Sequence, residues 1–115
     1  MYQITQLGNE PKQKITMNLN DGSRIVLNFE YKANQFGWFF GFQWQNFNYQ
    51  NIRLTTSYNI LRAYRSYLPF GIRCDTTDMQ EPTDLNDFIT GYATIYVLTQ
   101  SDVEATEGIY FQKVG

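Results

Sequence analysis

Alternation of apolar and polar residues with a period of two is the feature that most constrains the fold of this chain. Apolar residues occupy every second position over residues 15–19, and the alternation resumes over residues 25–31, after Asp21-Gly22. Because side chains of a β-strand point alternately to its two faces, the pattern predicts two strands joined as a hairpin.

The loop of this hairpin follows from keeping one face apolar. A two-residue loop of Asp21-Gly22 would place polar and apolar residues on the same face. A three-residue loop, residues 20–22, pairs Met17 with Ile25 and keeps one face apolar. It requires Gly22 in the left-handed conformation, which glycine adopts readily. We therefore expect the three-residue loop.

A second hairpin is predicted in an unusual stretch, residues 34–51, which mixes aromatic residues with Asn and Gln and carries no charge. Aromatic rings at positions 38, 40, 42 and 44 share one strand face, and a turn near Gln45-Asn46 returns the chain through residues 47–54. An uncovered segment of this kind would aggregate, so we expect the core or a partner to cover both faces. Alternating rings of this kind are mostly core, and the other interpretations are a platform for sugar binding and a contact between subunits.

The residue pattern in the second half of the chain predicts short helices and strands. Residues 57–68 show helical spacing of apolar residues, and Pro69 ends the helix. The apolar face of that helix should anchor it to the sheet. It consists of Ile60, Leu61, Tyr64 and Leu68. A strand is expected over residues 70–76.

Further elements are expected towards the C-terminus. A helical turn over residues 84–90 should be closed by Gly91, and residues 92–99 read as a central strand because both faces are apolar. Ser101 and Glu104 match a capping box at the start of a helical turn over residues 101–107. An edge strand over residues 109–114 completes the prediction.

Together these elements predict a single domain spanning residues 1–115. The expected fold is mainly β, a small β-barrel or sandwich built from hairpins. It should carry one short α-helix at about residues 57–68 and short helical turns near residues 84–90 and 101–107.

The chain has few of the residues that catalysis and metal binding usually need. Histidine is absent and Cys74 is the only cysteine, which removes Ser-His triads, Cys/His metal clusters and internal disulfides. Carboxylates recur every three residues from Asp75 to Asp84, but a calcium loop needs oxygens at alternate positions and a glycine at its turn. We expect no catalytic residue, metal or cofactor, and a buried, unreactive Cys74.

Charge is distributed very unevenly along the sequence. Residues 1–74 carry eight bases and three acids, a net charge of +5, whereas residues 75–115 carry one base and eight acids, a net charge of −7. The two sets either pair within the fold or give a subunit oppositely charged sides that bind neighbours. The sequence has no basic run and a pI near 4.9, so direct nucleic-acid recognition is not expected. It also has no apolar stretch long enough for a membrane span.

Several short segments resemble, in order and spacing, the small baseplate plug proteins of tailed bacteriophages. These segments are LRAYR (61–65), LPFGI (68–72), CDTTD (74–78), Glu81-Pro82, Asp87-Phe88, Gly91 and IYVLTQSD (95–102). The opening hairpin with Asp21-Gly22 and the Gly37-Trp38-Phe39 strand are also similar, so the resemblance spans nearly the whole chain.

The resemblance implies a virion structural protein, made in the cytoplasm of a bacterial host and located in the baseplate of a contractile-tailed phage. Such a plug or ring subunit would form a homo-oligomer, a trimer or hexamer, and would link the hub and spike proteins to the tail tube. Membership would make a set of charged residues candidates for protein interfaces. They are Arg62, Arg65, Arg73, Asp75, Asp78, Asp84 and Asp87. Two alternatives remain: a carbohydrate-binding module for host attachment, and a small carboxylate enzyme acting on cell-wall glycans.

Overall fold

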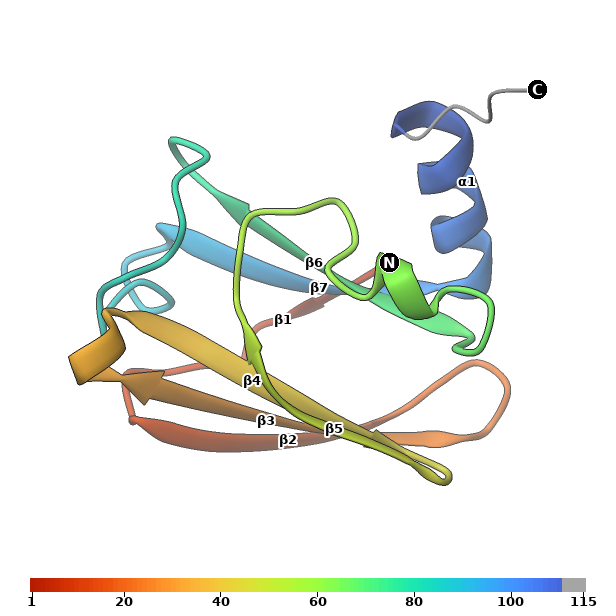
Figure 1. The fold of residues 1–115 in the computed structure, drawn as a ribbon, viewed down its shortest axis with the longest axis horizontal. Coiled ribbons are helices and arrows are strands. Elements are labelled where there is room, and N and C mark those ends of the chain that lie inside the picture. Colours follow the sequence, from red (N-terminus) through yellow and green to blue (C-terminus); the bar gives the residue numbers. More distant parts are fainter. Residues whose placement is uncertain (111–115) are drawn as a thin grey trace.

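Two antiparallel sheets pack against each other in the computed structural model, which describes residues 1–110 (Figure 1). The four-stranded sheet has the order β2-β3-β4-β5, with β2 (Lys12–Asn18), β3 (Arg24–Lys32), β4 (Gly37–Trp44) and β5 (Phe47–Arg53). The three-stranded sheet has the order β1-β7-β6, with β1 (Tyr2–Ile4), β7 (Ala93–Thr99) and β6 (Phe70–Thr76). The mainly β prediction is confirmed, and the sheets form a sandwich rather than a closed barrel.

The first hairpin has the predicted loop and register. Met17 lies opposite Ile25, and the Leu19 amide donates a 2.8 Å hydrogen bond to the Ser23 carbonyl. Gly22 has a φ of 87°, the left-handed conformation that the three-residue loop requires. The predicted loop and the predicted pairing of β2 with β3 are therefore confirmed.

The second hairpin is also confirmed, and both faces of β4 are largely covered. Its inner rings are buried between the sheets. On the outer face Phe39 is only 9% exposed, because the Lys32 ammonium and the Arg53 guanidinium lie 4.8 and 5.4 Å from its ring centre. Such cation–π contacts stabilise partly exposed rings by about 0.5–1 kcal/mol. The stretch is thus core on one face and a cation-covered surface on the other.

The predicted helix over residues 57–68 is wrong. This segment is a loop with one 3-10 turn, Arg62–Tyr64, and the other 3-10 turn is Ala33–Gln35. Ser57 forms a bridge with Cys74, so the loop is held along the edge of β6 by hydrogen bonds that a helix could not make. The apolar residues still face the core, because Leu61 and Leu68 are 1% and 2% exposed.

The C-terminal region differs from the prediction in its helix. The turn over residues 84–90 is present, with the Thr90 amide bonded to the Asn86 carbonyl at 3.0 Å and Gly91 at a φ of 80°. The expected turn over residues 101–107 is part of a longer helix, α1 (Gln100–Tyr110). Consequently the predicted edge strand is wrong at residues 109 and 110, and the rest of it lies outside the described residues.

The cap of α1 lies two residues earlier than predicted. The Thr99 hydroxyl accepts from the Asp102 amide at 3.2 Å, and the Asp102 carboxylate accepts from the Thr99 amide at 3.0 Å. This reciprocal pair is a capping box that satisfies two amides at the helix start. Thr99 ends β7 and caps α1 at once, which places α1 against the three-stranded sheet (Figure 1).

Aromatic side chains join the two sheets. The Phe70 ring of β6 meets the Phe42 ring of β4 edge-on, with centroids 5.5 Å apart, and lies 6.2 Å from the Trp44 ring. Phe88, from the 84–90 turn, adds a ring 4.7 Å from that of Trp38. The core is therefore continuous from one sheet to the other.

Candidate functional site

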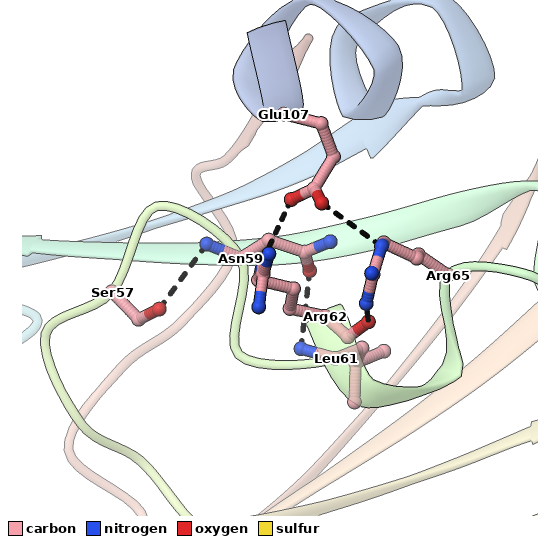
Figure 2. A network of polar contacts seen from close by, with 6 residues as sticks. All are labelled: Ser57, Asn59, Leu61, Arg62, Arg65 and Glu107. Atoms are coloured by element: carbon pink, nitrogen blue, oxygen red, sulfur yellow. Dashed lines mark hydrogen bonds and ion pairs between the residues drawn. The ribbon is translucent and has the colours of Figure 1, made fainter. Parts of the chain in front are cut away.

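The candidate interface residues fall into three separate clusters, and the first is an arginine clamp on Glu107. The Glu107 carboxylate of α1 receives the Arg62 Nε at 2.8 Å on one oxygen and the Arg65 Nε at 2.9 Å on the other (Figure 2). The Glu107 side chain is 17% exposed, whereas the arginines are 40% and 41% exposed. The clamp ties the end of α1 to the 55–69 loop.

Asn59 lies beneath this clamp and organises the loop. Its side-chain oxygen accepts from the Leu61 amide at 3.1 Å, and its main-chain amide donates to the Ser57 hydroxyl at 3.2 Å (Figure 2). The same side-chain oxygen also accepts from the Ile72 amide of β6 at 3.2 Å. Asn59 is 3% exposed, so its side chain provides hydrogen bonds to main-chain amides that are buried away from water. One side chain thus joins the loop to β6.

Gly71 leaves the space that Asn59 occupies. A Cβ at position 71 would stand 2.5 Å from the Asn59 side-chain oxygen, closer than such atoms approach. Because both groups are buried, neither can move aside without disturbing the main-chain hydrogen bonds.

The second cluster surrounds Arg73 on β6. The Arg73 Nε contacts the Asp75 carboxylate at 3.0 Å, and the guanidinium lies 5.2 Å from the centre of the Tyr58 ring. These residues line a groove together with Cys74, which is itself only 1% exposed. Burial, with the nearby Asp75 and Asp87 charges, raises the pKa of the Cys74 thiol to about 12. The thiol is therefore protonated and shielded, in line with the expectation of an unreactive cysteine.

The third cluster is the acidic loop, whose carboxylates bind its own backbone and side chains. Asp78 accepts from the Tyr92 hydroxyl, which lowers the pKa of Asp78 and raises the pKa of Tyr92. Asp87 is 7% exposed and accepts from the Asp84 amide at 2.9 Å, and the Asp84 carboxylate accepts from the Asn86 amide at 2.8 Å. Asp84 and Asp87 thus cap the 84–90 turn.

The structure therefore brings Arg62 together with Arg65, Arg73 with Asp75, and Asp84 with Asp87, and leaves Asp78 apart from these pairs. All seven candidates have a partner within the chain. The Arg53 side chain also has its partner within the chain, because it pairs with Glu81 at 3.0 Å. Arg53, Arg62, Arg65 and Arg73 thus pair with acids from the second half of the sequence, whereas Asp78, Asp84 and Asp87 accept hydrogen bonds from uncharged groups. An interface role for the seven candidates remains a prediction.

Asn59 and Glu107 were not among the candidates. The Ser57-x-Asn59 spacing could have indicated Asn59, since Ser and Asn side chains favour local turns over helix. Glu107 has no such signal, because nothing in its local sequence points to arginines in a distant loop.

A basic surface covers the outer face of the four-stranded sheet. Its charged members are Lys12, Lys14, Arg24, Lys32, Arg53 and a single acid, Glu30. Within residues 1–110, no carboxylate lies within 4.0 Å of the nitrogens of Lys12, Lys14 or Arg24. This outer basic face is the part of the described surface where positive charge is left without an ion-pair partner.

In residues 1–110, no three side chains of His, Cys, Asp or Glu converge as a metal site would require. The helices of this part of the chain are all too short or too polar to cross a membrane. Comparison of the sequence with protein-family models and with curated proteins returns no match.

Proposed function

We propose that this chain is a non-catalytic structural subunit that holds other proteins together in an assembly. The family resemblance makes that assembly the baseplate of a contractile-tailed phage, with the chain as a plug or ring subunit between the hub, the spike and the tail tube. It would act as a homo-oligomer, a trimer or hexamer. The observation that carries the non-catalytic half of the proposal is the use of the candidate charged residues to brace the fold.

A catalytic acid or base needs a free lone pair or proton facing a substrate. Here Glu107 is occupied by two arginines, and Asp87 accepts from a backbone amide while almost fully buried. The Cys74 thiol is buried and has a raised pKa, so it is a poor nucleophile. These engagements favour a structural role over turnover.

The outer basic face supports the second half of the proposal. Charged residues across protein interfaces steer encounter and select partners more than they add affinity. A surface with lysines outside any ion pair of the described chain suits contact with an acidic neighbour.

The carbohydrate-binding alternative has less support. Trp38 and Trp44, which would have stacked on sugar rings, are 0% and 7% exposed. Trp38 also donates from its indole to the Asp84 carbonyl at 3.0 Å, so its polar edge is occupied too. Stacking on a pyranose ring requires an accessible ring face, which neither indole offers.

Deletion of the coding sequence from the phage that carries it tests the proposal. Without the protein, tails should lack complete baseplates in electron micrographs, and the wild-type chain supplied in trans should restore them. Mass spectrometry of purified virions should detect the chain in multiple copies. Normal infectious tails without it, or virions from which it is missing, would contradict a role in the baseplate.

Charge reversal of Arg62 and Arg65 is not a clean test of an interface. Both side chains hold Glu107, so their reversal would also disturb α1. Reversal of Lys12 and Lys14 is cleaner, because no ion pair of the described chain uses them.

A further inference from the structure

The two sheets end in four outer strands, and β2 is the one whose free edge is both regular and uncovered (Figure 1). It pairs with β3 without a break over all seven residues, Lys12–Asn18. An uninterrupted edge presents a row of main-chain donors and acceptors that can pair with another strand.

The other three edges are blocked or short. On β5 the register shifts opposite Gly41, where Asn51 has a φ of 60°, which is the geometry of a bulge. The edge of β6 is taken by Ser57 and by the Ile60 amide, which donates to the Ile72 carbonyl at 2.7 Å. Strand β1 has only three residues. Each of these features prevents a long added strand.

Two hydrogen bonds at the ends of β2 establish which of its main-chain groups are free. The Leu19 amide bonds to Ser23, and the Tyr31 amide bonds to the Pro11 carbonyl at 2.7 Å. Because bonded and non-bonded pairs alternate in an antiparallel ladder, odd-numbered residues of β2 face β3. The even-numbered residues, 12, 14, 16 and 18, therefore point their amides and carbonyls away from the sheet. No hydrogen bond between described residues uses these groups.

Side chains along this edge differ between the two faces. Lys12 and Lys14 are exposed on the outer face, and Arg24 lies opposite Asn18 on the same face. On the inner side Ile15 and Met17 are only partly buried, although they pack against the core. A strand laid beside β2 would meet positive charge on one face and apolar surface on the other.

We propose that the β2 edge binds an extended acidic segment of a partner protein as a fifth strand of the sheet. Carboxylates of the segment would face Lys12 and Lys14, and the apolar residues between them would cover Ile15 and Met17. Main-chain pairing supplies affinity in this mode, and alternate side chains supply specificity. The proposal deepens the assembly role, on which it rests, by naming the chemistry of the partner.

A second copy of β2 is a poorer occupant than an acidic segment. Two β2 strands would bring four lysines together along one seam, and like charges across neighbouring strands destabilise the pair. An acidic segment replaces that repulsion with attraction.

The test uses the whole chain and a short labelled peptide in which Glu and Val alternate, with a Lys/Val peptide as its counterpart. In fluorescence anisotropy the Glu/Val peptide should bind at least about tenfold more tightly, and the difference should shrink as salt rises. Amide exchange at residues 14, 16 and 18 should slow when it binds.

Thr16→Pro removes one outward amide and no bond to β3, and proline is tolerated on a strand edge when its nitrogen faces solvent. It should abolish peptide binding, while Thr16→Ala, which keeps the amide, should bind as the wild type does. Binding that survives Thr16→Pro in a folded protein would overturn main-chain pairing.

A second variant, Lys12→Glu with Lys14→Glu, should bind the Lys/Val peptide more tightly than the Glu/Val peptide. If Thr16→Pro does not fold, this reversal of preference is the test of whether the peptides bind at the β2 edge. No binding of the Glu/Val peptide by the wild type overturns the proposal. Concentration-dependent dimers that Thr16→Pro disperses would assign the edge to a second copy instead. Neither result bears on whether the chain is present in virions, so the two proposals fail separately.

Discussion

The two sheets of this protein are assembled in different ways. The four-stranded sheet joins strands that follow one another along the chain, and its neighbours are connected by short loops. The three-stranded sheet pairs β7 with the distant β1 and with β6, which is separated from β7 by the long loop over residues 77–92, and it depends on Asn59 and Glu107 to hold the surrounding segments. Local turn chemistry suffices for the first sheet, whereas the second needs polar side chains that meet only after the chain has folded.

The largest expected effect tests whether the sheets unfold together. Phe70→Ala removes the ring that joins β6 to Phe42 and Trp44, and it should lower the free energy of unfolding by about 3–5 kcal/mol. Urea denaturation measures the loss. Circular dichroism and tryptophan fluorescence should still give coincident transitions. If they separate, the three-stranded sheet is an independent unit and the two regions differ more than the shared core suggests.

A smaller effect should be confined to the second region. Asn59→Ala leaves the Leu61 and Ile72 amides without their acceptor, and each buried unpaired amide costs about 1–3 kcal/mol. Hydrogen exchange should accelerate at those amides before it does in β3 and β4. Asn48→Ala, on the exposed outer face, is the matched control and should change stability by less than about 0.5 kcal/mol. Uniform acceleration across both sheets would show that Asn59 supports the whole fold.

The arginine clamp should contribute less than Asn59. Glu107→Gln removes the charge that two partly exposed arginines share, so we expect a loss of up to about 1 kcal/mol that fades in high salt. Glu104→Gln, one turn earlier on the exposed side of α1, controls for the change in helix charge. If both variants lose the same free energy of unfolding, the contacts of Glu107 with Arg62 and Arg65 add no stability beyond the effect of one charge on the helix.

The smallest effect concerns Asp78 and depends on pH. Its folded pKa is lowered by the hydrogen bond from Tyr92, so its contribution is complete above the unfolded pKa of about 4 and is lost as pH falls through the folded value. The raised pKa of Tyr92 predicts a second loss as pH rises above about 10. Melting temperatures of the wild type and Asp78→Asn should therefore converge at acid pH. A difference in melting temperature that does not change with pH would show that the ionisation of Asp78 does not contribute to stability.

The parts of the fold that could be predicted from the sequence are those whose deciding interactions are local. The loop of the first hairpin and its register followed from alternation and from one glycine, because every partner lies a few residues away. The helix over residues 57–68 was wrong because spacing of apolar residues cannot show that the β6 edge will be present to bind Ser57 and Asn59. Strand β1 is too short to give a pattern.

For the candidate interface, the sequence indicates which residues are charged but not which partners those residues will have in the folded protein. The unequal halves left open whether acids and bases would pair inside the fold or across an interface. Arg62 and Arg65 find Glu107 through an arrangement that no local pattern encodes. The free edge of β2 likewise depends on which strand ends the sheet, and strand order is a property of the folded chain.

The close approach of Asn59 to the bare Cα of Gly71 has a consequence for how this protein can change over time. A side chain added at position 71 would have to displace Asn59, and a shorter residue at position 59 would leave two amides unpaired. Single substitutions at either site are therefore both unfavourable, although a simultaneous exchange of the two could preserve the volume they fill. We therefore expect positions 59 and 71 to covary, or to stay unchanged, among homologous sequences.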